Sequence, residues 1–155
     1  MSASAPPETE TMESLAVASR LFGPLRVPAE DIILMPEGML GFAGERRFVM
    51  LPAAPEGVFW LQSLDDGGLI FLLVDPFLFF PDYMVDSPEV PEPAPGEKIG
   101  VLSIVTLPRA AGEPCTVNLQ GPLIIQSPGR VARQVILADP RYHTRHSFDL
   151  RSRLA

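Results

Sequence analysis

The chain has 155 residues, a length typical of one domain, and a formal net charge of −7. Hydrophobic residues make up 46% of it, enough to build a packed core, so the composition excludes wholesale disorder. The single cysteine, Cys115, excludes an intrachain disulfide and fits a reducing compartment. No apolar run is long enough to span a membrane and no export signal is visible, so we expect a cytoplasmic location.

The chain is expected to hold one folded domain between two tails. Residues 1–16 are small, polar and proline-bearing, which predicts a disordered N-terminal tail, and residues 151–155 form a short C-terminal tail. Between them, residues 17–150 alternate short apolar runs with proline and glycine. The runs expected to form strands are 20–22, 25–27, 31–35, 48–51, 58–64, 69–74, 98–107, 116–120, 123–126 and 131–137.

Turn residues separate these runs at close intervals. Asp65-Asp66-Gly67-Gly68 predicts a hairpin, Ser127-Pro128-Gly129 predicts a second turn, and Gly38 and Gly41 are expected at positive φ. Eighteen prolines and no sustained helical periodicity argue against long helices, apart from a short turn near residues 42–46 and another at the C-terminus. The predicted fold class is therefore all-β and mainly antiparallel: a compact barrel-like or sandwich domain with little helix.

Charge is unevenly distributed along the chain. From Phe48 to Glu97 there is no lysine or arginine but nine acidic residues, whereas six arginines follow Pro128. Nucleic-acid binding depends on cations that neutralise phosphates, so the acidic stretch disfavours RNA or DNA as a ligand. This stretch is either a solvated surface with internal ion pairs or an acidic face that steers a basic partner, and composition alone does not choose. Residues 86–97, rich in proline and acid, predict an exposed extended loop.

Groups that could carry chemistry are few. His143 and His146 are the only histidines, and only Asp139 and Asp149 accompany them, so no zinc site with three or four ligands is predicted. Cys115 has no histidine nearby in the sequence and is expected to pack rather than react. No nucleophile-elbow or phosphate-binding glycine motif is present. The sequence therefore predicts neither an enzyme nor a bound cofactor.

One segment is unusual, because Asp75-Pro76-Phe77-Leu78-Phe79-Phe80-Pro81-Asp82-Tyr83 holds four aromatic residues fenced by prolines and aspartates. Proline removes backbone donors, so the segment is expected at a sheet edge or in a loop. Its aromatic side chains either complete the core or stay at the surface as anchors for a protein partner. Alternate side chains of an extended segment can do both.

Several blocks of the sequence together resemble the FliW family of bacterial flagellar assembly factors. The centre of the resemblance is DPFLFFPDY, preceded by FWLQSL and LIFLLV. Other blocks follow the family in the same order: LFGPLRVPAEDIILMPEGMLGFAGERRFVMLP, IGVLSIVTL, TVNLQGPLIIQ and RQVILADPRYHTRH. The resemblance covers roughly residues 20–147. The chain departs from it at Asp75, where many relatives have asparagine, and in residues 86–97, where relatives often have a short acidic helix.

The resemblance implies a compact barrel-like β fold and a binding protein with two alternative partners. FliW proteins bind flagellin in the cytoplasm and, when free, bind the RNA-binding regulator CsrA, which relieves the repression of flagellin synthesis. The residues expected near the partner surface are Phe77, Phe79, Phe80, Asp82, Tyr83, Asp86, Asn118 and Gln120. The last two are expected on one face of a strand, or alternatively they satisfy neighbouring backbone groups.

The alternative prediction is a generic OB-like barrel that binds nucleic acid or oligosaccharide. The charge pattern argues against nucleic acid, because the aromatic residues lie in the acid-rich half of the chain and most arginines lie in the other. A monomer is expected, since no second large apolar stripe is evident in the sequence.

Overall fold

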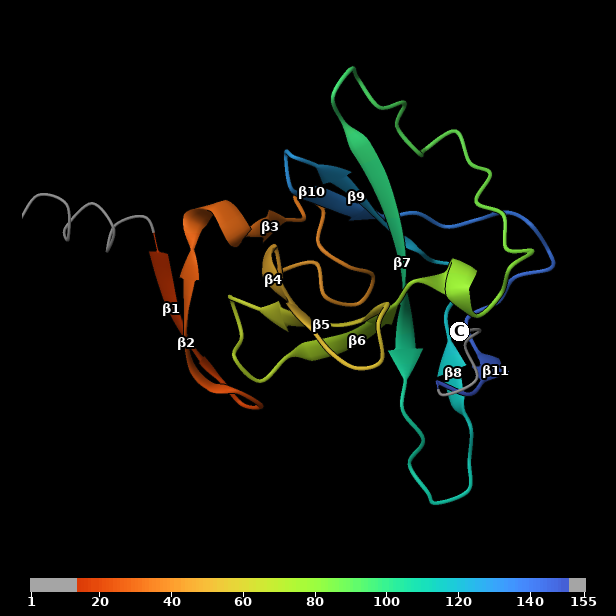
Figure 1. The fold of residues 1–155 in the computed structure, drawn as a ribbon, viewed down its shortest axis with the longest axis horizontal. Coiled ribbons are helices and arrows are strands. Elements are labelled where there is room, and N and C mark those ends of the chain that lie inside the picture. The colour runs from red at the N-terminus through yellow and green to blue at the C-terminus, as the bar shows by residue number, and fades with distance from the viewer. Residues whose placement is uncertain (1–13, 151–155) are drawn as a thin grey trace, which may run out of the picture.

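The computed structural model describes residues 14–150, which form eleven strands and two short 3-10 helices (Figure 1). The strands are β1 (Ser14–Ser19), β2 (Gly23–Pro28), β3 (Ile33–Leu34), β4 (Arg47–Pro52), β5 (Val58–Ser63), β6 (Ile70–Val74), β7 (Lys98–Thr106), β8 (Cys115–Val117), β9 (Leu123–Ser127), β10 (Val131–Gln134) and β11 (His146–Phe148), and the 3-10 helices are η2 (Ala29–Asp31) and η3 (Pro76–Leu78). β1 begins at Ser14, ahead of the expected start of the domain at residue 17. The rest of both expected tails lies outside the described residues.

Seven strands close into a barrel. β3 to β7 follow one another antiparallel, β7 then pairs with β9, and β9 pairs with β10. A parallel contact, Val131 opposite Leu34, joins β10 to β3 and completes the circuit. β8 and β11 extend the sheet beyond β7, while β1 and β2 form a separate hairpin. The all-β, barrel-like fold class is confirmed, and closure removes the free strand edges that an open sheet would expose.

Alternation along the strands sorts the apolar side chains into an inner and an outer core. On β5, Phe59 and Leu61 belong to one cluster, whereas Val58 and Trp60 belong to another. The first cluster is the barrel interior, because every barrel strand contributes to it. Its buried members are Ile33, Met35, Met39, Phe48, Leu61, Leu73, Leu102, Leu123, Ile125 and Ala132.

Two layers cover the outside of the barrel. The β1–β2 hairpin packs Val17 and Val27 onto Val49 and Leu64, and in Figure 1 it lies at the opposite end of the molecule from β8 and β11. The second layer consists of the segment after η3 and the C-terminal residues 135–150, which pack on outward side chains of β6, β7 and β9. This second layer positions the candidate site.

Hydrogen bonds at the turn of the β1–β2 hairpin connect it to the barrel, in addition to its apolar packing. The Ser19 hydroxyl donates to the buried Gln62 side chain at 2.6 Å, and the Arg20 amide donates to the Gly67 carbonyl at 2.9 Å. A Cβ atom on Gly67 would lie 1.9 Å from the carbonyl oxygen of Ala18. Only glycine therefore allows the hairpin to approach the β5–β6 turn this closely.

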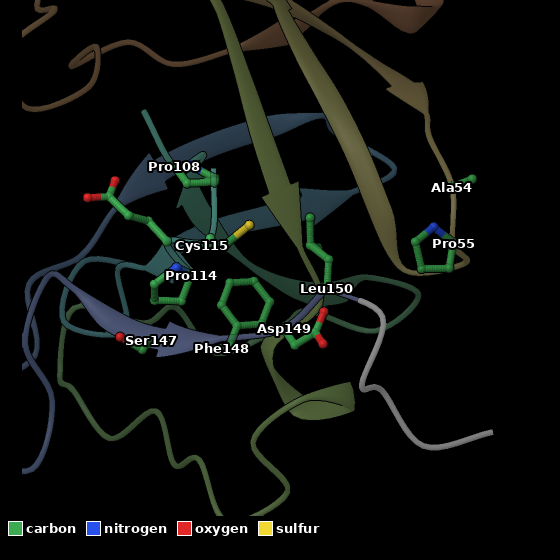
Figure 2. A pocket seen from close by; sticks show the side chains of 11 residues that line it. Ala54, Pro55, Pro108, Pro114, Cys115, Ser147, Phe148, Asp149 and Leu150 are labelled. Carbon is green, nitrogen blue, oxygen red and sulfur yellow. The ribbon is translucent and has the colours of Figure 1, made fainter. Parts of the chain in front are cut away.

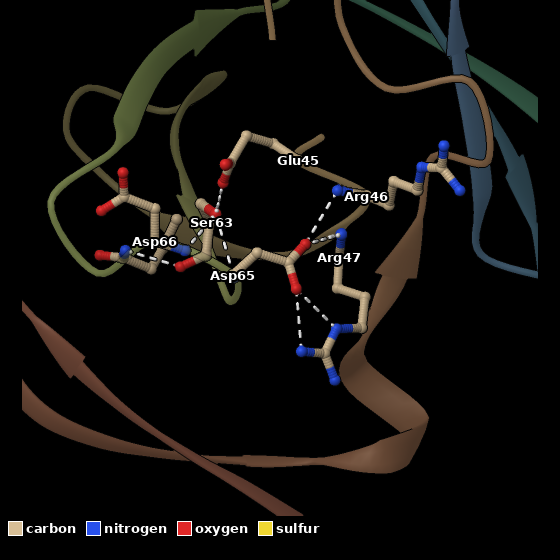
Figure 3. A network of polar contacts seen from close by, with 7 residues as sticks. Glu45, Arg46, Arg47, Ser63, Asp65 and Asp66 are labelled. Carbon is tan, nitrogen blue, oxygen red and sulfur yellow. Dashed lines mark hydrogen bonds and ion pairs between the residues drawn. The ribbon is translucent and has the colours of Figure 1, made fainter. Parts of the chain in front are cut away.

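The predicted hairpin at residues 65–68 joins β5 to β6, and its first aspartate accepts hydrogen bonds from backbone amides (Figure 3). The Asp65 carboxylate accepts hydrogen bonds from the Arg46 and Arg47 amides at 2.9 and 3.0 Å and forms an ion pair with the Arg47 guanidinium at 2.8 Å. Partial burial acts to raise the pKa of Asp65, but these hydrogen bonds outweigh it and leave that pKa below its usual value. Asp65 is thus a structural residue that fixes the start of β4.

Most predicted turns are confirmed, whereas two regions differ from expectation. Gly38 and Gly41 have φ values of 67° and 84°, and residues 127–129 connect β9 to β10. Residues 20–22, expected as a strand, form the turn between β1 and β2. The C-terminal part of the chain differs as well. The strand expected over residues 116–120 ends at Val117, and the C-terminus forms β11 against β8 where a turn was expected. β11 has three residues, too few for any periodicity, and it forms only because β8 offers a partner.

Candidate protein-binding site

The central aromatic segment leaves β6 through a capped turn. Asp75 accepts a hydrogen bond from the Phe77 amide at 3.0 Å and Pro76 stands at the first helical position, so η3 begins where the sequence supplies both signals. The amides of Phe79 and Phe80 both donate to the Pro76 carbonyl, and a second turn follows. The segment is therefore a pair of tight turns, and the extended conformation that would alternate its side chains is not formed.

Tyr83 is the scaffold of the segment. Its side chain is 5% exposed, and its hydroxyl donates to the Leu119 carbonyl at 2.7 Å. Its ring lies 4.8 Å from that of Tyr142 in an edge-to-face arrangement, and the Tyr142 hydroxyl in turn accepts from the Met84 amide at 3.0 Å. Burial strongly raises the pKa of Tyr83, so this phenol stays protonated and can donate its hydrogen bond to Leu119.

The other aromatic residues form a gradient from core to surface. Phe79 and Phe80 are half-buried against Phe148 of β11, with ring centroids 5.1 and 6.0 Å apart. Phe77 is 42% exposed, and its ring centroid lies 5.6 Å from that of Tyr83. The aromatic run thus supplies both core and surface, as the sequence allowed, and Phe77 is its surface member.

A hollow of about 330 Å³ opens between this segment and the C-terminal residues. We call it the aromatic hollow, and its lining is Phe79, Phe80, Pro81, Asp82, Tyr83, Leu119, Arg141, Tyr142 and His146. Four of the predicted site residues are therefore brought together in one wall. The opposite wall comes from residues that no sequence argument selected as a partner surface. The only sequence feature that could have indicated this wall is the presence of Tyr142 and His146 after the last long apolar run, residues 131–137.

Arg141 brings a cation to the rim of the aromatic hollow. Its guanidinium lies 5.2 Å from the Tyr142 ring centroid and 2.6 Å from an Asp139 carboxylate oxygen. The hydrogen bond and charge of Asp139 raise the pKa of Arg141, and the same hydrogen bonds lower the pKa of Asp139. The charge of the exposed Asp82 carboxylate also acts on Arg141, so two carboxylates accompany one guanidinium at the rim.

A pair of stacked histidines closes the C-terminal wall. The rings of His143 and His146 lie 3.7 Å apart at 14°, and the His143 amide donates to Nε2 of His146 at 2.9 Å. Burial, and then the neighbouring His143, lower the pKa of His146. A neutral His146 ring, 6.2 Å from Phe80, therefore completes the largely apolar lining. Among residues 14–150, no three potential metal ligands lie together, so the two histidines have no third ligand.

Comparison with known proteins identifies the family. The FliW protein family model matches residues 16–148, which include both walls of the aromatic hollow. This chain belongs to the FliW family. It is 38% identical over 138 residues to the flagellar assembly factor FliW of Treponema denticola, a match that covers 86% of this chain and 93% of that one. It is 37% identical over 140 residues to that of Moorella thermoacetica, with 86% and 88% covered.

A solved FliW structure has the same fold. A crystal structure of the flagellar assembly factor FliW superimposes with a TM-score of 0.74 at 29% sequence identity, and the match covers 85% of this chain and 95% of that chain. The FliW resemblance expected from the sequence is thus confirmed. The assignment of individual residues to a partner surface stays a prediction.

Asn118 and Gln120 do not lie on one face of a strand in this FliW chain, because β8 ends at Val117. Asn118 instead accepts hydrogen bonds from the amides of Gln120 and Gly121 at 3.0 and 2.8 Å. It shapes the turn that presents Leu119 to Tyr83. The prediction of two polar residues facing one side was wrong, and the backbone-satisfying alternative holds for Asn118.

Asp86 lies outside the aromatic hollow, at the start of the proline-rich loop. Residues 86–97 contain no strand or helix and are mostly exposed, as expected for an extended loop. Within the described part of the chain, Asp86 and Glu92 are exposed and form no ion pair. Internal ion pairing, one of the two explanations offered for the acidic stretch, therefore does not apply to these two carboxylates.

Cys115 lines a different and larger hollow of about 800 Å³, between the Ala54–Pro55 loop and the paired strands β8 and β11 (Figure 2). Burial, followed by the charge of Asp149, raises the pKa of Cys115, which disfavours a reactive thiolate. The cysteine thus behaves as the packing residue that was expected.

Over residues 14–150, no helix has the length and apolar character needed to cross a membrane.

Proposed function

We propose that this FliW-family chain is a flagellar assembly factor that acts in the cytoplasm, as a monomer, by binding proteins. Flagellin is one proposed partner and the RNA-binding regulator CsrA is the other. The observation that carries the proposal is the aromatic hollow, whose lining is largely apolar and whose rim has two carboxylates, Asp82 and Asp139, around Arg141. Aromatic side chains around a hollow are typical of protein-binding hot spots.

The acidic rim suits a partner that binds RNA. Such a partner carries cations for phosphate contacts, and those cations are attracted by exposed carboxylates. Asp82 lines the hollow, and Asp86 and Glu92 continue the acidic surface along the loop. Binding of CsrA to this surface would withdraw it from RNA and relieve the repression of flagellin synthesis.

Two partners for one protein form a linked equilibrium. FliW held by flagellin is withdrawn from CsrA, and export of flagellin releases it. Free FliW would then track the flagellin level without any catalytic step. This scheme needs only that binding of one partner lowers the affinity for the other.

A charge-reversal experiment tests the acidic surface. The combined variant Asp82→Lys, Asp86→Lys, Glu92→Lys should weaken CsrA binding about tenfold or more and reduce its salt dependence, measured by calorimetry at two salt concentrations. The matched control, Glu30→Lys, Asp31→Lys, Glu113→Lys, changes the net charge equally at exposed positions elsewhere and should bind nearly normally. Equal losses in the two variants would show that only net charge matters, which contradicts the proposal.

A truncation at the surface aromatic tests the flagellin contact. Phe77 does not line the aromatic hollow, but it is exposed and its ring adjoins that of Tyr83, which does. Phe77→Ala should weaken flagellin binding about tenfold, whereas Leu107→Ala, at a residue with similar exposure away from this segment, should not. Unchanged flagellin binding by Phe77→Ala would contradict the placement of this partner. A short RNA serves as a third ligand, and tight binding to it would favour the OB-like alternative.

A further inference from the structure

One end of the barrel interior is left open by a glycine. Alternation along β7 places Gly100 on the same side as Leu102 and Ile104, which belong to the inner core. In the β7–β9 register, Gly100 lies opposite Ile125, another inner-core residue. Because glycine has no side chain, the interior is unfilled at this position.

A hollow of about 460 Å³ occupies this end, and we call it the barrel mouth. Its lining includes the apolar side chains of Met50, Phe59, Leu102 and Ile125, contributed by four different barrel strands. A volume of this size lies in the range of sites that hold small ligands or a few side chains. The barrel mouth therefore presents inner-core surface to the outside.

The charged residues that line the barrel mouth are both acidic. Glu56 comes from the β4–β5 turn and Asp75 from the end of β6. One Asp75 oxygen accepts from the Phe77 amide, which fixes the carboxylate at the rim. Lys98 of β7 lies opposite Ser127, a lining residue, so two carboxylates and one lysine surround this end of the barrel. An apolar floor with two carboxylates at its edge matches a group that is itself apolar and adjoins a cation.

We propose that the barrel mouth binds a protein segment that inserts one large apolar side chain next to a lysine or arginine. The apolar side chain would cover Met50 and Ile125, and the neighbouring cation would reach the Asp75 carboxylate at the rim. η3 separates this site from the aromatic hollow, because Leu78 lines the barrel mouth whereas Phe79 lines the hollow. The barrel mouth is a second site, and it stands whether or not flagellin and CsrA bind at the first.

Filling the barrel mouth is structurally feasible. A Cβ atom at Gly100 would meet only the Ile125 carbonyl, at an ordinary 3.9 Å, and this glycine does not have the left-handed φ that other residues avoid. Gly100→Leu should therefore fold and occupy the hollow. Gly44→Leu is the matched control, because its new side chain would enter open space in a loop. Asp75→Asn removes one rim charge but keeps an acceptor for the Phe77 amide.

The experiment uses the full chain with labelled methionine methyl groups and three short synthetic peptides, which alternate leucine with lysine, leucine with glutamate, or serine with lysine. Titration with the leucine–lysine peptide should shift the Met50 methyl resonance and leave that of Met84, beside the aromatic hollow, in place. Gly100→Leu should weaken this binding about tenfold or more, and Gly44→Leu should not. Asp75→Asn should weaken it several-fold and reduce its salt dependence.

Three outcomes would overturn the proposal. The first is binding of the leucine–lysine peptide to Gly100→Leu with normal affinity. The second is equal binding of the leucine–glutamate peptide, which would remove the role of the carboxylates. The third is equal binding of the serine–lysine peptide, which would leave only charge attraction. None of these results depends on the flagellin and CsrA measurements, so the two proposals fail separately.

Discussion

The buried hydroxyl of Tyr83 provides a direct test of how the aromatic hollow is held together. It joins the central segment to Leu119, 36 residues further along the chain, through a hydrogen bond of 2.7 Å. The substitution Tyr83→Phe removes this bond and keeps the ring, and therefore also keeps the ring contacts with Tyr142 and Phe77. The change removes a single hydroxyl, which bonds Leu119 and lies beside the buried Ser103 side chain, from an otherwise apolar layer.

The expected loss follows from burial. A buried carbonyl whose donor is removed costs about 1–3 kcal/mol, because water does not readily replace the lost partner. Tyr83 is 5% exposed and Leu119 is 1% exposed, so the two partners of this bond are largely withdrawn from water. We expect the free energy of unfolding to fall by about 2 kcal/mol, which corresponds to a Tm lower by about 4–8 °C for a domain of this size.

Equilibrium unfolding in urea measures this loss, with the fluorescence of Trp60, the only tryptophan, as the signal. The urea midpoint should fall while the slope of the transition stays unchanged. Tyr142→Phe is the control, because its hydroxyl accepts from the Met84 amide at a less buried position and should cost about 1 kcal/mol or less. If Tyr83→Phe costs no more than Tyr142→Phe, the hydroxyl does not hold the layer together and the reasoning fails.

Two further predictions concern the hairpin and the histidine pair. Gly67→Ala places a Cβ atom 1.9 Å from the Ala18 carbonyl oxygen, so the β1–β2 hairpin should detach and become sensitive to trypsin. Gly129→Ala is the control, because its Cβ atom would enter open space and should leave the hairpin resistant. Equal trypsin sensitivity of the two variants would contradict the close approach. The pKa of His146 lies below its usual 6.5 in the folded protein because of burial and the neighbouring His143. The unfolded chain therefore takes up this proton at a higher pH than the folded one, and stability should be complete above about pH 7 and fall as the pH drops through 6.5. His146→Gln should flatten this dependence in urea unfolding at a series of pH values, and an unchanged slope would contradict the assignment.

The local signals in the sequence were sufficient for the strands and turns of the barrel. The runs at residues 48–51, 58–64 and 69–74 became β4, β5 and β6, because each is a short, mostly apolar run of strand length bounded by turn residues. The hairpin at residues 65–68 followed from its aspartates and glycines. The Asp75-Pro76 pair likewise marks the start of η3, since capping and a fixed φ are properties of the residues themselves.

The limits of the sequence are clearest at the candidate site. Asn118 and Gln120 were predicted to lie on one face of a strand, but the chain turns at Asn118 because its side chain accepts from the amides of Gln120 and Gly121. β11 carries no periodic pattern and forms only by pairing with β8. Sequence position also gives no reason to place Tyr142 and His146 opposite Phe80, some sixty residues earlier.

The sequence by itself determined that this protein is an all-β domain of the FliW family with an acidic, aromatic central segment. Composition, turn chemistry and the order of the blocks that resemble FliW can be read along the chain. They do not depend on how the strands are arranged in space. Only the tertiary structure decided which aromatic residues are buried, which distant residues complete the hollow, and that Gly100 faces an open barrel end. These features depend on strand register and barrel closure, which are set by contacts between segments far apart in the chain.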